Sequence, residues 1–173
     1  MKRSLVLLVF FALLFTGIGA YFGWKQLAPV APVNIAVASL MQQTLPDSAG
    51  NSRQFGEWKG KILLVNFWAT WCPPCVAEMP ELVDLQTEMK EKNLQIVGIG
   101  IDSPSNIREF AAKYKISYPL LMAGMEGTEL SRQFGNQAGG LPFTVLIDAS
   151  GQVRQTYLGR LDMSKVRKDL ASL

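Results

Sequence analysis

The sequence predicts an α/β domain in which helices flank a mixed central sheet, preceded by one transmembrane helix. Three observations support this prediction: a long uncharged segment at the N-terminus, two apolar strand-like runs that are each followed by a helical pattern, and a C-terminal β-hairpin with a final helix. Of the 173 residues, 49% are hydrophobic and 18% are charged, so the chain can build one domain and an N-terminal appendage.

The N-terminal appendage has the length and charge pattern of a membrane anchor. Lys2 and Arg3 precede an uncharged run over residues 4–24, which as a helix would span roughly 31 Å, enough to cross the hydrocarbon core of a bilayer. A cleaved secretory signal is the alternative, although its best cleavage motif, Ala36-Val-Ala38, lies well past the apolar run. Both alternatives export the domain. The two basic residues before the span favour an N-inside orientation, with residues 1–24 as the anchor.

The remainder of the chain divides into a tether and a domain. Residues 25–38 are rich in Ala and Val and contain two prolines, which predicts an extended linker, and the domain is expected over residues 39–173. The chain has 17 basic residues, two of them before the uncharged run, against 14 acidic ones, and it has no basic stripe. We therefore expect no binding to nucleic acid.

The first half of the domain alternates strands with helices. A turn at residues 45–50 separates two short extended pieces. Residues 62–67 are almost continuously apolar, which predicts a central strand covered on both faces. From residue 73 to about residue 91 the apolar residues recur at helical spacing, and Pro80 is expected to kink this helix. A second strand and helix are expected at residues 94–101 and 105–114.

The second half is expected to complete the sheet with antiparallel strands. A turn with Gly151 in the left-handed region predicts a hairpin. The expected elements are a short extended piece near residues 118–122, a helix near 128–134, hairpin strands at 143–147 and 152–157, and a last helix at 164–170.

Two cysteines, Cys72 and Cys75, lie where the first apolar strand passes into the first long helix. The free N–H groups and the dipole of a helix N-terminus stabilise a thiolate, so Cys72 is the expected nucleophile. Cys75 lies about one turn further on, where it can form a disulfide with Cys72 and release a partner from a mixed disulfide. Pro73 and Pro74 favour a first helical turn and stiffen the dithiol.

Three other roles for the cysteine pair fit the sequence less well. A structural disulfide between residues so close in sequence would close a tiny loop and stabilise little. A zinc site needs about four ligands, which a chain with two cysteines and no histidine does not supply alone. A peroxidatic cysteine would have a threonine three residues before it, where Cys72 has Ala69. We expect no metal and no cofactor besides the redox-active Cys72–Cys75 disulfide.

Three short motifs lie around the cysteines and before a later strand. They are Val65-Asn-Phe-Trp-Ala-Thr-Trp-Cys-Pro-Pro-Cys75, Glu78-Met-Pro80 and Gly140-Leu-Pro142. Together they resemble the TlpA/ResA/CcmG group of thioredoxin-like proteins, over most of residues 45–159. The resemblance implies a thioredoxin-like fold and a periplasmic domain, tethered to the inner membrane by a single-pass anchor, that exchanges disulfides with protein substrates. Such proteins are usually reductants, cytochrome c maturation is one of their uses, and their electron donor is a membrane thiol carrier of the DsbD/CcdA type.

The resemblance also implies roles for residues near the dithiol. It implies a cis peptide bond before Pro142, which would leave the Leu141 backbone facing Cys72 and free to pair with an extended substrate. An ordinary proline at the start of a strand is the alternative. Glu78 follows Cys75 on the same side of the helix and is a candidate proton acceptor, or else a solvated charge.

Two tryptophans and one asparagine complete the candidate site. Trp71 adjoins the nucleophile and is expected to contribute to an apolar docking surface, whereas Trp68 is expected to pack in the core. Asn66 stands where cytoplasmic thioredoxins have a buried aspartate. Because an amide cannot titrate, any base that deprotonates Cys75 must be Glu78 or water.

These features favour an enzyme, a thiol–disulfide oxidoreductase that reduces protein disulfides. Two alternatives remain: a dithiol oxidase that donates disulfides, and a tethered binding module with incidental cysteines. The motif does not separate reduction from oxidation, because the direction depends on the reduction potential and on the partner that docks.

Overall fold

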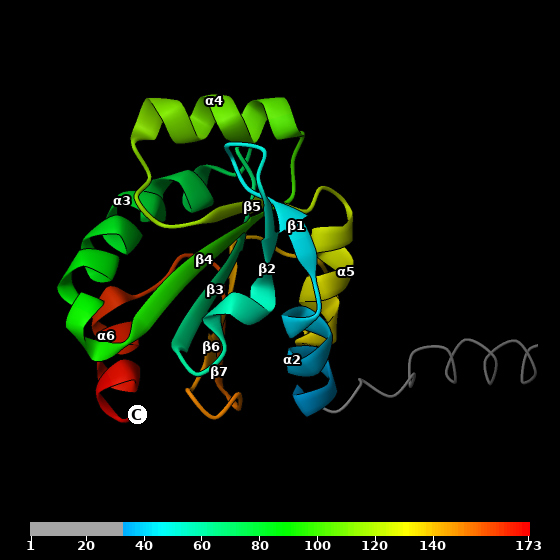
Figure 1. Ribbon diagram of the computed structural model, residues 1–173. Coiled ribbons are helices and arrows are strands. Elements are labelled where there is room, and N and C mark those ends of the chain that lie inside the picture. Colours follow the sequence, from blue (N-terminus) through cyan, green and yellow to red (C-terminus); the bar gives the residue numbers. More distant parts are fainter. Residues whose placement is uncertain (1–32) are drawn as a thin grey trace, which may run out of the picture. The chain divides into compact units, whose positions relative to one another are not determined.

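Runs of apolar residues form the three central strands of the sheet. β3 (Ile62–Trp68), β4 (Leu94–Gly100) and β6 (Phe143–Ile147) are almost wholly buried, as expected for strands that are covered on both faces. The sheet has the order β5-β4-β3-β6-β7, in which β5 is Leu120–Met122 and β7 is Val153–Leu158. The computed structural model describes residues 33–173 (Figure 1).

The sheet is mixed, as predicted. β3 and β5 both run parallel to β4, whereas β6 runs antiparallel to β3 and β7. The two parallel connections contain α3 (Pro73–Glu88) and α4 (Pro104–Tyr114). Because β6 runs against β3 and β4, its first residue lies at the same edge of the sheet as the last residues of those two strands. That edge holds the cysteine pair and Pro142.

Helices cover both faces of the sheet (Figure 1). One face packs against α3, α4 and α6, and the other packs against α2, α5 and a small antiparallel hairpin of β1 and β2. The remaining bounds are α2 (Val33–Met41), β1 (Thr44–Pro46), β2 (Ser52–Gln54), η1 (Phe55–Trp58), η2 (Lys90–Lys92), α5 (Glu126–Gln133) and α6 (Met163–Ala171).

Helix α2 corrects the predicted boundary between linker and domain. An extended linker was expected over residues 25–38, but the chain is helical from Val33. Ala36, Val37 and Leu40 are buried in the core, because their helical spacing places them on one face. The domain therefore includes the six residues before 39 that the sequence assigned to the linker.

The predicted anchor at residues 1–24 lies outside the described residues. Among the helices of residues 33–173, none has the length and apolar composition needed to cross a membrane.

The other elements lie near their predicted positions. β6 has the predicted bounds, and the hairpin turn that follows it has Gly151 in the left-handed region, with a φ of 84°. Helix α3 contains Pro80 and ends at Glu88, earlier than expected. A short 3₁₀ turn, η2, follows there, and Asn93 closes it in the left-handed conformation.

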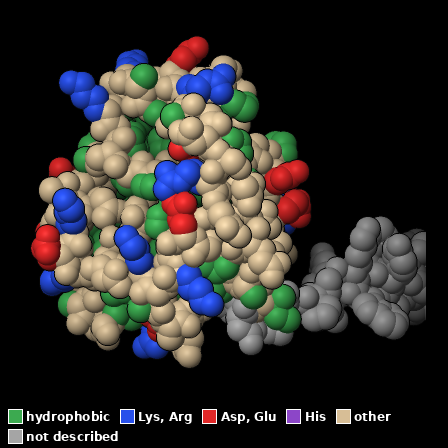
Figure 2. Space-filling model, in the orientation of Figure 1, with side chains coloured by type: hydrophobic (Ala, Val, Ile, Leu, Met, Phe, Trp, Pro, Cys, Tyr) green, Lys and Arg blue, Asp and Glu red, His purple; other side chains and the backbone are tan. Residues whose placement is uncertain are grey.

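Acidic and basic side chains are interspersed over the face of the molecule drawn in Figure 2. Two ion pairs join the C-terminal segment to α3. Arg160 lies 3.0 Å from Glu81, and Arg167 lies 2.9 Å from Glu88. Since both pairs are exposed to solvent, their main effect is to orient side chains and they add little stability.

Candidate active site

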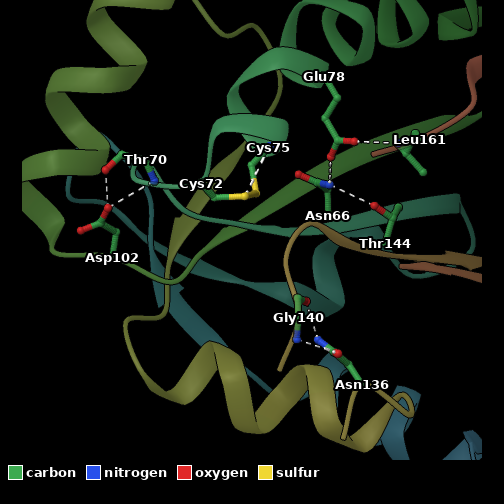
Figure 3. Close-up of a disulfide and its surroundings, with 10 residues drawn as sticks. All are labelled: Asn66, Thr70, Cys72, Cys75, Glu78, Asp102, Asn136, Gly140, Thr144 and Leu161. Atoms are coloured by element: carbon green, nitrogen blue, oxygen red, sulfur yellow. Dashed lines mark hydrogen bonds between the residues drawn. A yellow bond between two sulfur atoms is a disulfide. The ribbon is translucent and has the colours of Figure 1, made fainter. Parts of the chain in front are cut away.

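The two cysteines lie at the start of α3, at the edge of the sheet where β3 ends. Cys72 is the N-cap of the helix, and Pro73 and Pro74 occupy its first positions. Cys72 and Cys75 form a disulfide with their Cα atoms 5.3 Å apart (Figure 3). The Cys75 N–H donates a hydrogen bond to the Cys72 Sγ at 3.4 Å. The helix N-terminus therefore directs a donor at this sulfur, the arrangement that stabilises a thiolate.

The two cysteines differ in their exposure and in the exposure of their neighbours. Cys75 is completely buried, whereas Cys72 retains 4% exposure and is followed by the exposed Pro73 and Pro74. Trp71, immediately before Cys72, is 65% exposed. Trp68 is fully buried with its ring centroid 4.9 Å from that of Phe110, which confirms its predicted packing role. The exposed residues that surround Cys72 therefore offer a partner a way of approach, whereas Cys75 is enclosed.

The loop before β6 lies beside the dithiol. The Leu141–Pro142 peptide bond is cis, as the resemblance implied, and Pro142 is buried. Leu141 packs against the apolar cluster that contains both cysteines. Asn136 holds this loop through two hydrogen bonds to Gly140, from its Nδ2 to the carbonyl oxygen at 2.9 Å and to its Oδ1 from the N–H at 3.1 Å.

A groove of about 650 Å³ lies beside Trp71, the residue that precedes Cys72. Trp71 and Leu141 line it, together with residues after β4 and residues of α5 such as Thr128 and Arg132. Two of the predicted substrate-binding residues are thus brought together on one groove.

Glu78 lies to one side of the disulfide, and its carboxylate points toward Asn66 and Leu161 (Figure 3). Its side chain is completely buried. Its Oε1 accepts a hydrogen bond from Asn66 Nδ2 at 2.8 Å, and its Oε2 accepts one from the Leu161 N–H at 2.9 Å. Burial raises the pKa of Glu78 above its ordinary value, although the two hydrogen bonds and the charge of Arg160 oppose the shift. This burial excludes the alternative of a solvated surface charge.

Asn66 connects the carboxylate of Glu78 to the sheet. Besides the bond to Glu78, its Nδ2 donates to Thr144 Oγ1 at 3.0 Å. The amide of Asn66 therefore links β3, β6 and α3 within the core. Because the amide of Asn66 and the hydroxyl of Thr144 are neutral, Glu78 is the acidic side chain of these three residues.

A second carboxylate, Asp102, was missed by the sequence analysis. It follows β4 and accepts hydrogen bonds from the backbone N–H of Thr70, at 3.2 Å, and from the Thr70 hydroxyl. Its other oxygen accepts from the Ser103 N–H at 2.6 Å and from Asn106 Nδ2 at 2.8 Å. Burial tends to raise the pKa of Asp102, but these hydrogen bonds prevail and lower it. The sequence did contain one indication of this role, because Asp102 directly follows a central strand and so lies at the edge of the sheet that carries the cysteines.

The geometry of the site agrees with its similarity to known proteins. Residues 32–170 match the family model described as Redoxin. The thiol–disulfide oxidoreductase ResA of Geobacillus thermodenitrificans is 28% identical over an alignment 173 residues long, which covers 99% of this chain and 94% of that protein. ResA of Bacillus thuringiensis subsp. konkukian is 30% identical over 128 residues, or 73% of this chain and 72% of that protein.

Solved structures show the same relationship. The crystal structure of a thiol:disulfide interchange protein of the thioredoxin family from Chlorobium tepidum has a TM-score of 0.67 to this chain. It is 28% identical, and the match covers 75% of this chain and 91% of that one. The chain therefore belongs to the Redoxin family, as a ResA-like thiol–disulfide oxidoreductase with a thioredoxin-like fold.

Proposed function

We propose that this protein is a membrane-anchored protein-disulfide reductase, which uses the Cys72–Cys75 dithiol on exported proteins in the periplasm. The observation that carries the proposal is the position of Cys72 at the N-terminus of α3, with an amide donor at its sulfur and with its partner sulfur buried. The charges before the uncharged run at residues 4–24 support a single-pass anchor in the inner membrane with the N-terminus inside.

In the proposed cycle, the Cys72 thiolate attacks one sulfur of a substrate disulfide. That disulfide breaks, and its second sulfur leaves as a thiolate that takes up a proton. Cys75 loses its proton to Glu78 and attacks the Cys72 sulfur, which breaks the bond between Cys72 and the substrate. The substrate sulfur leaves as a thiolate and takes up a proton from solvent, so that the substrate departs as a dithiol and Glu78 then releases its proton. Two electrons thereby pass to the substrate, and the protein is left with the Cys72–Cys75 disulfide. The raised pKa of Glu78 suits it to accept a thiol proton.

The proposed substrate surface surrounds Cys72. Trp71, Pro73 and Pro74 lie on the exposed side of the disulfide. The Leu141 backbone, held by the cis bond to Pro142, is proposed to pair with an extended substrate segment. The exposed ring of Trp71 would contact apolar substrate side chains at the start of the groove.

The oxidised protein needs an electron donor to complete its cycle. We propose a membrane thiol carrier of the DsbD/CcdA type, and apocytochrome c as a candidate substrate. Both proposals are supported by the motifs around Cys72 and Pro142 that resemble the TlpA/ResA/CcmG group.

The function can be tested with the full chain purified in detergent. Cys72→Ser should lower the rate of protein-disulfide reduction on the order of a thousandfold or more, because the attacking sulfur is removed. Cys75→Ser is the matched control, since it keeps Cys72 and should accumulate a mixed disulfide with the substrate. Full cellular function of the Cys72→Ser variant would instead support a binding module.

The direction of electron flow is tested by the reduction potential of the Cys72–Cys75 pair in glutathione or dithiothreitol buffers. A potential near the about −270 mV of thioredoxin, or below it, would support a reductase. A potential near the about −120 mV of DsbA would support the dithiol oxidase instead.

A further inference from the structure

Three buried polar atoms of the described residues have no hydrogen-bond partner in the protein. They are Asn66 Oδ1, Trp68 Nε1 and the Tyr118 hydroxyl. All three side chains are at most 3% exposed. Buried polar atoms are almost always hydrogen-bonded in native proteins, so three such atoms in one interior need a common explanation.

The three atoms belong to side chains that border one point of the sheet, Gly98. Asn66 lies directly opposite Gly98 in the parallel register of β3 and β4. A Cβ added to Gly98 would lie 3.1 Å from Trp68 Nε1 and 3.4 Å from Tyr118 Cε2. The other close atom is the flexible end of Leu120, with its Cδ2 at 2.5 Å. Trp68 and Tyr118 thus lie against Gly98, and Asn66 is its partner on the neighbouring strand.

The hydrogen-bonding capacities of the three groups complement a single water molecule. The Trp68 indole N–H can only donate, the Asn66 Oδ1 can only accept, and the Tyr118 hydroxyl can do both. Interior waters typically make about three hydrogen bonds to buried groups that would otherwise be unpaired. We propose that Asn66, Trp68 and Tyr118 bind one internal water beside Gly98, and that this water orients the Asn66 amide toward Glu78.

The orientation of this amide matters for the carboxylate of Glu78. The Asn66 Nδ2 donates to Glu78 and to Thr144, whereas a flipped amide would turn its oxygen toward the carboxylate. A water that donates to Asn66 Oδ1 stabilises the orientation in which Asn66 Nδ2 donates to Glu78. Trp68 and Tyr118 are therefore positioning residues, which act on Glu78 through the water and Asn66. The inference rests on the proposed role of Glu78 as the proton acceptor.

Several groups besides Asn66 act on Glu78. Its carboxylate accepts a hydrogen bond from the Leu161 N–H, and it interacts with the charges of Arg160 and of Glu81 on its own helix. Burial raises the pKa of the Tyr118 phenol, and the charge of Glu78 raises it further. In the reduced protein, the thiols of Cys72 and Cys75 are two further titratable groups of the site. If the amide of Asn66 loses its orientation, the pKa of Glu78 should rise further, because its carboxylate loses a donor.

Gly98→Ala tests the site directly, because its methyl group would lie 3.1 Å from Trp68 Nε1 and 2.5 Å from Leu120 Cδ2, so that the groups around the proposed water must shift. Gly100→Ala is the matched control on the same face of the same strand. Its methyl would meet the side chain of Ile107, with the closest atom at 2.4 Å. The two variants introduce similar crowding, but only one of them affects the three polar atoms.

Two measurements on the reduced full chain in detergent test the water itself and, separately, its effect on Glu78. The first is the nuclear Overhauser effect between water and the Trp68 indole proton, which should be present in the wild type and in Gly100→Ala and lost in Gly98→Ala. The second is the pH at which alkylation of the dithiol is half-maximal, which should rise by about half a pH unit in Gly98→Ala. Tyr118→Phe should shift it in the same direction, and Tyr114→Phe on the surface should not.

The inference is overturned if the wild type lacks the water signal at Trp68. It is also overturned if Gly98→Ala and Gly100→Ala change the alkylation profile equally. Should Gly98→Ala fail to fold, Tyr118→Phe decides by the same two readouts. Glu78→Gln separates this inference from the proposed function. A profile unchanged by Glu78→Gln would remove Glu78 as the proton acceptor, and the water signal at Trp68 would still decide the water site.

Discussion

The two faces of the central sheet carry different kinds of residue, although the same strands supply both. The buried side chains that β3, β4 and β6 place toward α2 and α5 are all apolar. Toward α3 and α6, the same strands place Asn66 and Thr144 among apolar neighbours, and Glu78 meets them there. Because successive side chains of a strand point to opposite faces, one strand can serve stability on one side and chemistry on the other.

Phe67→Ala tests the apolar face and should have the largest effect on stability. Phe67 is fully buried and contacts the rings of Phe134 and Phe143. Its loss should lower the free energy of unfolding by about 3–5 kcal/mol, measured by urea denaturation. The pH profile of dithiol alkylation should stay as in the wild type, and a shifted profile would contradict the division between the faces.

Asn66→Ala tests the opposite face at the neighbouring position. The variant removes the Asn66 donor from Glu78 Oε1 and from Thr144 Oγ1 in the core, so the free energy of unfolding should fall by about 1–3 kcal/mol. The pKa of Glu78 should rise, so the alkylation profile should move to higher pH. A loss of stability without a change in the pH profile of alkylation would show that Asn66 has a structural role only.

Glu78→Gln should change how stability depends on pH. Because burial raises the folded-state pKa of Glu78, its unfolded-state pKa is the lower of the two. The stabilising contribution of the protonated form is complete at pH values below the unfolded-state pKa, and it is lost as pH rises through the folded-state pKa. Subtracting the unfolding free energies of the variant from those of the wild type should give a negative slope of at most about 1.4 kcal/mol per pH unit. A flat or rising difference would contradict the raised pKa.

Trp71→Ala should have the smallest effect on stability, within about 0.5 kcal/mol, because the side chain is largely exposed. The reduction of protein disulfides should nevertheless slow on the order of tenfold, through the loss of an apolar contact. Reduction of glutathione disulfide provides the control and should keep its rate. Equal slowing of both substrates would show that Trp71 acts on the dithiol and not on docking.

Much of the fold follows from periodicity and turn residues. The apolar run at 62–67 and the strand at 143–147 were predicted within one residue of their bounds, because few other structures can bury such runs. Helix α2 was missed because prolines and small residues precede it, and because only tertiary contacts of Ala36, Val37 and Leu40 stabilise so short a helix.

The candidate site was predicted where its residues adjoin one another in the sequence. Cys72, Cys75 and Trp71 belong to one motif, and the placement of the cysteines at a helix N-terminus followed from local pattern. The bonds between Thr70 and Asp102 and between Asn66 and Thr144 join residues far apart in the chain. Such pairs depend on strand order, which local pattern does not determine.

The unequal access to the two sulfurs constrains the order of events in the proposed cycle. Since Cys75 is enclosed, the substrate disulfide and the electron donor must both approach Cys72, and they must do so in turn. The two partners then compete for one docking place, so that each inhibits the other at high concentration. We therefore expect ping-pong kinetics, in which the rate of turnover depends on the supply of both the reductant and the substrate.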